Sequence, residues 1–308
     1  MRTADAGERA ARVVLEPLRL VGQKNGFITG TISSLADIWE RRELLGLLVR
    51  RELTARYKDS SLGVVWSLFR PLAQLLIYYF AIGILLSASR SVPDFAIFVF
   101  VGLTVWSLFA EILDQATTSI VNNAGIVKKV YLPREVFPLS TVGSAMFNFG
   151  VQLVILLIAT IAIGSPPLTP DLALAPLSFL VIVVFGTAIG LLLAALNVYY
   201  RDVQHIIEVV LIMLFWASPI VYSFTYVHNA LGGSWLESVY LANPVTVAII
   251  GMQKALWVSG STATGKLAQA FPDNLLSLLL ISLAASLVLL WLSQRIFSRM
   301  QRNFAQEL

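Results

Sequence analysis

The sequence predicts an all-α membrane protein with six transmembrane helices and both termini in the cytoplasm. The 308 residues are 57% apolar and only 13% charged, whereas soluble domains carry about 25% charged residues. The mean hydropathy is +0.78, and the apolar residues gather in long runs. Lys and Arg are concentrated in alternate connections between these runs. Together these observations predict a multi-pass membrane protein.

Six apolar runs are long enough to cross a membrane. A hydrocarbon core of ~30 Å requires roughly 20 residues of helix. We expect spans at Pro71–Ser89, Phe95–Leu113, Val136–Ile163, Leu172–Leu196, Val203–Phe224 and Leu275–Gln294. They form a membrane domain over residues 61–300, followed by a cytoplasmic tail at 301–308.

The positions of Lys and Arg predict how the spans are oriented. With these six spans, 19 of the 22 basic residues fall on one side, and only Arg90, Lys254 and Lys266 fall on the other. Basic residues flanking spans are retained in the cytoplasm. Both termini are therefore expected to be cytoplasmic.

The segment before the first span predicts an amphipathic helix over residues 35–60. Apolar residues recur at spacings of seven and four, at Ile38, Leu45, Val49, Leu53 and Tyr57, which makes one helical stripe. A helix of this kind lies among lipid headgroups, with its arginines on phosphates; an ordinary juxtamembrane anchor is the alternative. Residues 1–34 are charged and lack an apolar core, so we expect a cytoplasmic extension rather than a signal peptide.

The connection between the fifth and sixth spans is too long for a simple loop. Its segment Val245–Trp257 has 13 apolar-rich residues after Asn243-Pro244, and at 1.5 Å per residue it cannot cross the membrane. A short interfacial or re-entrant helix at an external mouth is expected. A surface helix without a gating role is the alternative.

Several kinds of chemistry are disfavoured. The chain has no cysteine and only two histidines, which leaves little for a thiolate or zinc site. Gly260–Lys266 has phosphate-loop spacing, but Leu267 replaces the required hydroxyl, and we interpret the match as coincidence. The net charge of +4 requires no nucleic acid, because basic residues beside a membrane can bind lipid.

The few charged residues of the spans are expected near the cytoplasmic side. Glu111 and Asp114 lie at the cytoplasmic end of the second span, Arg70 lies at the cytoplasmic edge of the first, and Glu208 lies near the cytoplasmic end of the fifth. Ion-coupled carriers usually place ionisable groups near the midplane. Uncharged span centres therefore argue against a stand-alone secondary carrier.

Two cytoplasmic loops are candidate docking elements for a partner. Residues 122–134 combine polar helix-capping residues, a short amphipathic element and Pro133, and residues 197–202 (Asn-Val-Tyr-Tyr-Arg-Asp) carry two aromatics and two opposite charges. Either could be an ordinary solvated loop. With the helix at 35–60, they present three elements on one face.

In combination these motifs resemble the membrane subunits of type-2 ABC exporters of lipid-linked polysaccharides, such as O-antigen, capsule, galactan or teichoic acid precursors. The resemblance rests on residues 50–63 running into Trp66–Pro71, on residues 128–134 and 197–202, and on Asn243-Pro244. It implies a homodimer that binds two copies of an ABC-type ATPase. ATP and magnesium would then belong to the ATPase, with no cofactor on this chain.

The resemblance also implies residue roles. The outer segment between the fifth and sixth spans would form gate helices. ATPase coupling would fall to Asn123, Gly125, Ile126, Lys128, Lys129, Tyr131, Arg201 and Asp202. The interface helix would carry Arg50, Arg51, Glu52, Arg56, Tyr57 and Lys58.

Aromatic residues recur along the second span and in and just after the fifth, and they suggest a glycan path. Phe98, Trp106 and Phe109 share one helical face, and Phe215, Tyr222 and Tyr226 share another, with Pro219 able to bend the helix. Aromatic faces can support the apolar C–H faces of sugar rings through weak, exchangeable contacts. The alternative is that these rings pack against neighbouring helices or lie in interfacial belts.

We therefore expect a non-enzymatic permease of the bacterial inner membrane that exports a glycan linked to undecaprenyl diphosphate. Same-fold exporters of teichoic acid, lipid or drug, and a stand-alone carrier, are the alternatives.

Overall fold

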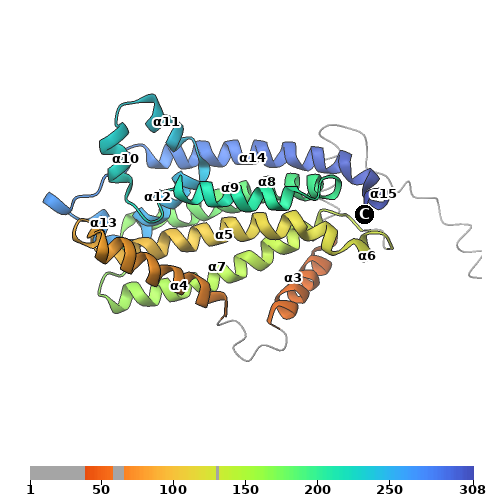
Figure 1. Cartoon of the computed structure of the whole chain (residues 1–308), viewed down its shortest axis with the longest axis horizontal. Coiled ribbons are helices and arrows are strands. Elements are labelled where there is room, and N and C mark those ends of the chain that lie inside the picture. Colours follow the sequence, from red (N-terminus) through yellow and green to blue (C-terminus); the bar gives the residue numbers. More distant parts are fainter. Residues whose placement is uncertain (1–38, 58–65, 130–131) are drawn as a thin grey trace, which may run out of the picture.

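The computed structural model describes residues 39–57, 66–129 and 132–308, and all regular structure in these ranges is helical. The helices form an elongated bundle (Figure 1). One end, called here the α6 end, carries α6 (Ala124–Val127) and α15 (Phe304–Glu307). The opposite end, the α10 end, carries α10 (Phe224–Leu231), α11 (Trp235–Leu241) and α13 (Val258–Ser261).

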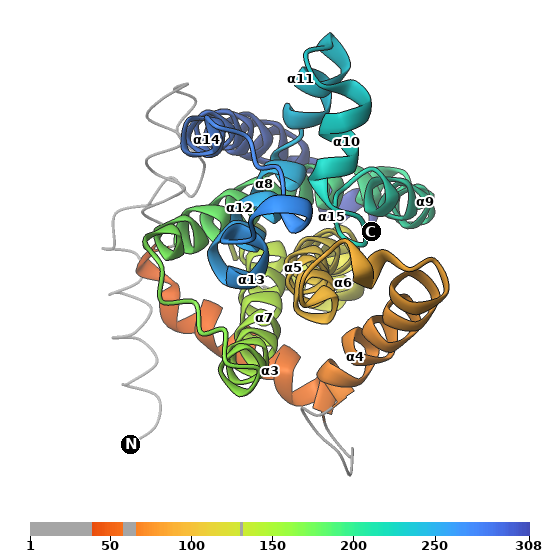
Figure 2. The same cartoon turned by 90° about the vertical axis from the view of Figure 1, so that its left-hand side faces the viewer.

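Helix α5 (Phe95–Asn122) is the centre of the bundle. It contacts α4 (Trp66–Tyr78), α7 (Val136–Ala162), α8 (Leu174–Tyr199), α9 (Val203–Trp216) and α12 (Pro244–Leu256), and Figure 2 shows it enclosed by its neighbours. Of its most apolar stretch 78% is buried, compared with 22% in α14 (Leu275–Met300). Its apolar residues therefore form the core.

Four helices of the described residues are long and apolar enough to span a membrane by themselves: α5, α7, α8 with its preceding turn, and α14. They correspond to the predicted second, third, fourth and sixth spans. The first and fifth predicted spans are shorter helices, at Phe69–Leu85 and Val203–Trp216. The last seven residues of the first, Tyr79–Leu85, are π-helical.

The prediction that the fifth helix continues to Phe224 is wrong. Helix α9 ends at Trp216, just before Ser218-Pro219, and proline disfavours helical geometry in the residue before it. The chain then turns and packs against α5, where a Cβ on Gly102 would lie 3.1 Å from Ile220 Cα. Pro219 thus ends the helix instead of bending it.

The apolar segment after Asn243 is helical, as predicted, but it does not lie on a surface. Helix α12 follows α11 at an angle of 80°, and the Asn243 side chain accepts a hydrogen bond from Val245 N at 3.0 Å. Nearly every residue of α12 is buried. The alternative of a surface helix is therefore wrong.

Helix α3 (Arg42–Tyr57) packs on α7. Its Val49 side chain fills the space left by Gly143, where an added Cβ would lie 2.7 Å from Val49 Cγ2. The stripe expected to face lipid is therefore partly covered by protein, while Trp39 and Leu47 stay exposed.

The last residues of the chain are packed against the α6 end. Phe304 of α15 is fully buried beside Phe297 and Tyr199, and the Tyr199 hydroxyl donates to Met300 O at 2.8 Å. The segment predicted as a cytoplasmic tail is thus folded onto the bundle. The extension at 1–34 lies outside the described residues.

Candidate functional site

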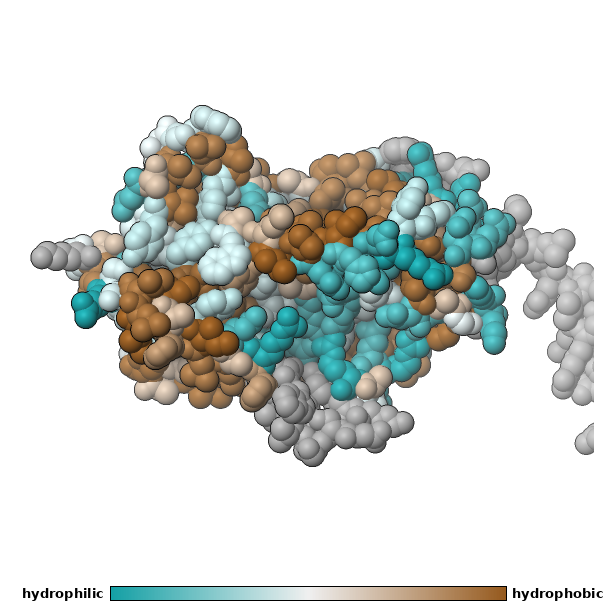
Figure 3. Space-filling view, viewed as in Figure 1, coloured by the Kyte–Doolittle hydropathy of each residue, from teal (hydrophilic) through white to brown (hydrophobic). Residues whose placement is uncertain are grey.

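A cleft of about 840 Å³ lies between α4, α5 and α9, with contributions from α3 and α7. It opens on the face shown in Figure 3, where hydrophilic side chains gather in a hollow between the apolar surfaces of α4 and α9. The cleft has an aromatic part and a polar part, built from different helical turns.

The aromatic part is formed by Tyr78, Trp106, Phe215 and Trp216. The Tyr78 and Phe215 rings stack at 5.7 Å, and Trp106 meets Phe215 edge-on at 5.6 Å. Such pairs favour a fixed geometry beyond simple burial. The rings therefore form an ordered wall that leaves part of Tyr78 and Trp216 open to the cleft.

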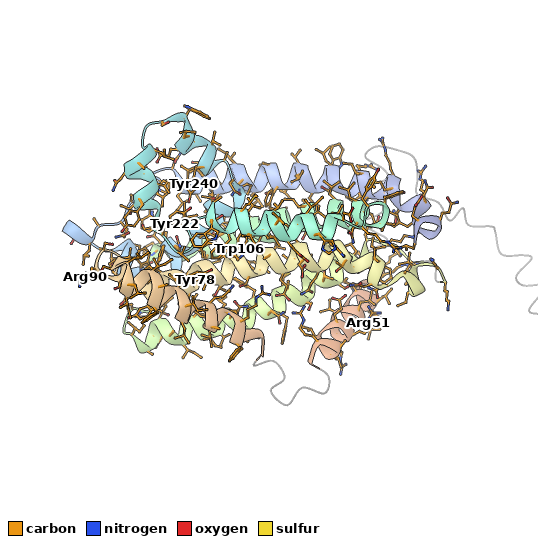
Figure 4. All side chains as sticks on the ribbon, in the orientation of Figure 1. Arg51, Tyr78, Arg90, Trp106, Tyr222 and Tyr240 are labelled. Carbon is orange, nitrogen blue, oxygen red and sulfur yellow. The ribbon has the colours of Figure 1, made fainter. Side chains whose placement is uncertain are left out.

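This wall continues towards the α10 end. The Tyr222 hydroxyl donates to Trp216 O at 2.9 Å and lies 3.4 Å from the Tyr240 hydroxyl. Figure 4 shows Tyr78, Trp106, Tyr222 and Tyr240 between α4 and the α10–α11 hairpin. A continuous aromatic series thus connects the hairpin with the cleft.

The polar part is organised around Glu111 of α5. Its Oε1 accepts hydrogen bonds from Gln115 Nε2 at 2.8 Å and Asn148 Nδ2 at 2.6 Å, and it pairs with Arg56 of α3. Three donors on one oxygen hold this carboxylate in place. Arg70, Asp114 and Glu208 complete the charged lining.

These charges correct the expectation of uncharged span centres. Because α5 continues to Asn122 instead of ending near Leu113, Glu111 lies about 16 Å of helix from its end. Its partner Asn148 lies about 18 Å from the start of α7. The polar part therefore reaches the middle of two membrane-spanning helices.

A polar stripe on α7 was missed in the sequence. Ser140, Ser144, Asn148 and Gln152 are four residues apart, so they share one helical face. Ser140 donates to Glu52 of α3 at 2.7 Å, Asn148 bonds Glu111, and Gln152 lines the cleft. The spacing of four within an otherwise apolar run was the signal available in the sequence.

The structure separates the six predicted path residues into three pairs. Trp106 and Phe215 line the cleft, and Tyr222 and Tyr226 lie towards the α10 end, where the Tyr226 hydroxyl is 2.9 Å from Ser91 Oγ. Phe98 and Phe109 are buried, against Trp257 at 4.8 Å and Phe185 at 5.9 Å. These last two rings therefore pack in the protein core.

The predicted coupling residues lie at the α6 end. Gly125, Lys128 and Lys129 are exposed, and so are Arg201 and Asp202 in the loop between α8 and α9. Ile126 is half-buried and packs against a cluster that includes Val127, Phe137 and Phe297. Tyr131 lies outside the described residues.

The predicted interface helix, α3, forms polar contacts with the turn at Asn123 and with the cleft. Arg51 Nη2 donates to Asn123 Oδ1 at 2.7 Å, and Arg56 pairs with Glu111. Burial raises the pKa of Glu52, although Ser140 and the neighbouring arginines oppose this shift. Arg50 is exposed and Tyr57 ends α3, whereas Lys58 lies outside the described residues.

The site holds no recognisable metal-binding arrangement: across residues 39–57, 66–129 and 132–308, no three His, Asp or Glu side chains are grouped to bind an ion. The segment Gly260–Lys266 forms parts of α13 and a short 3₁₀ turn, and the described residues contain no strand before it.

The sequence of this chain is similar to those of known membrane transport proteins. The profile of the family described as ABC-2 type transporter matches residues 43–257. The chain is 31% identical to the O-antigen export system permease protein RfbA of Myxococcus xanthus, over 90% of this chain and 100% of that protein. It is 27% identical to the RfbA protein of Klebsiella pneumoniae and 24% identical to the polysialic acid transport protein KpsM of Escherichia coli, each over 71% of this chain and 82% of the relative.

Proposed function

Because this chain belongs to the ABC-2 type transporter family, we propose that it is the permease subunit of an ATP-driven exporter in the bacterial inner membrane. Its substrate would be a polysaccharide of O-antigen or galactan type, linked to undecaprenyl diphosphate, which it moves outward. The observation that carries this proposal is the aromatic series from Tyr240 to Trp106, which leads into a polar cleft. Such a surface suits a ligand with both apolar ring faces and hydroxyl edges.

The proposed topology has six membrane crossings, with both termini in the cytoplasm. In this arrangement the shorter helices at Phe69–Leu85 and Val203–Trp216 cross together with the four long ones. The α6 end, which carries Lys128, Lys129, Arg201 and, bonded to Asn123, Arg51 of α3, would be cytoplasmic. Arg90, at the opposite end (Figure 4), would be external, and α10–α12 would form the gate.

A second copy of the chain would close the cleft into a conduit. The cleft is open, and the helices on both sides expose large apolar side chains: Leu76 and Ile77 on α4 with Phe80 in the π-helical segment after it, and Val209, Ile212 and Met213 on α9. Lipid would cover such ridges equally well, but it would leave the charged lining facing hydrocarbon, which is costly. A symmetric dimer across this face keeps the charges in an aqueous path.

The ATPase would bind at the α6 end, and ATP and magnesium would belong to that partner. The exposed residues Gly125, Lys128, Lys129, Arg201 and Asp202 offer polar and basic contacts there. The hydrogen bond between Arg51 and Asn123 connects this surface with α3, and Arg56 connects α3 with Glu111. Movement at the docking surface would thereby reach the cleft.

The alternatives differ in what supports them. A stand-alone carrier was disfavoured because the span centres were expected to be uncharged, and the charges found in mid-span remove that argument. Membership of the ABC-2 family nevertheless favours an ATPase partner. Exporters of teichoic acid, lipid or drug share the fold. The aromatic series and the names of the relatives favour a glycan of O-antigen type.

Deletion of the gene in its own bacterium tests the function. Surface polysaccharide should disappear while its lipid-linked form accumulates inside the inner membrane, and the restored gene should reverse both effects. The purified chain should also bring an ABC-type ATPase with it. Unchanged surface polysaccharide after deletion would refute the proposal.

A further inference from the structure

The polar part of the cleft contains a buried hydrogen-bond acceptor with no partner. The Gln152 side chain lines the cleft and is only 3% exposed. Its Oε1 makes no hydrogen bond in the protein. A buried acceptor without a donor destabilises the empty protein, and a ligand that supplies an N–H or O–H group relieves that cost.

The groups around Gln152 define which ligand could supply this donor. Asn148 lies one helical turn away on α7, and Glu111 and Gln115 face it from α5. Carboxylate and amide oxygens are acceptors. Together with the aromatic wall of Tyr78, Trp106 and Phe215, they match a ring with several hydroxyl groups and an apolar face.

The charges of the cleft argue against an anionic ligand. Three carboxylates line it, from Glu111, Asp114 and Glu208, against two guanidinium groups, from Arg56 and Arg70. Arg56 is already paired with Glu111. An acidic sugar would meet an excess of negative charge in the lining, and like charges brought together across a binding site are unfavourable.

We propose that this cleft binds a neutral, hydroxyl-rich segment of the exported glycan at Gln152 and selects against polyanionic glycans. The selection would come from acceptors that require a hydroxyl donor, and from the surplus carboxylate that repels acidic sugars. This inference rests on the proposed function and narrows its substrate class.

Two oligosaccharides that differ only at C6 provide the test. We would titrate a neutral α-1,4-linked galactose hexamer and the corresponding galacturonate hexamer into the purified complex of the chain with its ATPase, in lipid nanodiscs. Calorimetry measures both affinities. The neutral hexamer should bind at least about tenfold more tightly, equivalent to about 1.4 kcal/mol.

Substitutions separate the hydrogen bond from the charge. Gln152→Leu should weaken binding of the neutral hexamer by about three- to tenfold, the range expected for one lost hydrogen bond. Asp114→Asn combined with Glu208→Gln reverses the net charge of the lining. It should raise affinity for the galacturonate hexamer at least about fivefold, since it removes two repulsive charges.

Ser144→Ala is the matched control. Ser144 lies two turns before Gln152 on the same face of α7, and its buried Oγ also lacks a partner, but it does not line the cleft. Both Gln152→Leu and Ser144→Ala should raise the temperature of thermal unfolding of the empty protein. Only Gln152→Leu should change affinity for the hexamer.

Three results would overturn the inference: equal or tighter binding of galacturonate, unchanged affinity in Gln152→Leu, or no binding of either hexamer. These outcomes remain distinct from failure of the proposed function. If surface polysaccharide is lost on gene deletion while the neutral hexamer does not bind, only the subsite is wrong.

Discussion

At the scale of single residues, aromatic side chains on one helix have different surroundings. Phe98 of α5 packs between Phe95 and Trp257 and is only 1% exposed. Trp106, two turns further on, contacts Phe109 and Phe215 but borders the cleft. An aromatic residue therefore packs in the core at position 98 and lines the cleft at position 106.

Substitution at these two positions should separate stability from transport. We expect Phe98→Ala to lower the free energy of unfolding by about 3–5 kcal/mol, since it leaves a cavity in the core. Trp106→Ala should be less destabilising, because part of the ring lines the cleft, yet it should slow glycan export. Chemical unfolding and surface glycan measured for both variants provide the check.

Tyr222→Ala extends this comparison along the aromatic series. It should reduce export, and a greater loss is expected in combination with Trp106→Ala. Normal export by that double variant would assign both rings to packing alone.

Gly125 and Ile126 provide a second pair with different roles. A Cβ on Gly125 would meet nothing within 4 Å, so Gly125→Trp should leave the fold intact while it blocks ATPase docking. Ile126→Asp should lose docking and also stability, because Ile126 packs against the buried cluster at the α6 end and a buried charge is costly. Copurification of the ATPase and the thermal unfolding temperature distinguish the two. Retained export in Gly125→Trp would contradict the proposed docking surface.

At the scale of elements, α3 is held by polar side chains on three sides. Arg51 bonds the turn at Asn123, Glu52 accepts from Ser140 of α7, and Arg56 pairs with Glu111 of α5. The arginines predicted from the sequence to face lipid phosphates thus include two that bind protein. Helix α3 therefore contacts both the turn at Asn123 and the cleft, and protein contacts as well as lipid hold it in place.

Glu52→Gln should reveal the cost of burying this carboxylate. Burial raises the pKa of Glu52, so the ionised form is disfavoured in the folded chain relative to the unfolded chain. The contribution of Glu52 to stability is therefore greatest below its ordinary pKa and declines as pH rises through the raised value.

The amide oxygen of glutamine can still accept from Ser140, and it carries no charge. We expect Glu52→Gln to unfold at a higher temperature than the natural chain at pH 7.5, and the difference should shrink as pH falls towards 4.5. Thermal unfolding in detergent across this range measures it. A difference that grows at low pH would contradict the assignment.

At the scale of the whole molecule, basic residues lie mainly at the α6 end. This distribution predicts that the α6 end is cytoplasmic. Since the chain has no cysteine, single cysteines can report the orientation without background. The best positions are exposed ones at opposite ends.

Leu168→Cys and Lys129→Cys meet this requirement. Leu168 is 84% exposed in the connection between α7 and α8, and Lys129 is exposed beside α6. In intact cells an impermeant thiol reagent should label Leu168→Cys and leave Lys129→Cys unlabelled until the membrane is opened. The reverse result would invert the topology.

The sequence by itself determined the class of the molecule and the positions of most of its helices. Apolar runs near 20 residues have few alternatives to membrane helices, because backbone groups in lipid must bond within their own segment. The four long spans followed from this rule. The helical segment after Asn243 followed from another rule, since an Asn-Pro pair can cap a helix through a local hydrogen bond.

Only the tertiary structure decided which of these residues meet. Phe98 and Trp106 share one face of α5, but Trp257, just after α12, makes the first a core ring, and Phe215 of α9 makes the second part of the cleft wall. The cluster of Arg56, Glu111 and Asn148 joins three helices whose residues are far apart in sequence. The length of α5 decided how deep in the membrane this cluster lies. Side-chain spacing within one helix records which residues share a face, and the partner of that face depends on how distant segments pack.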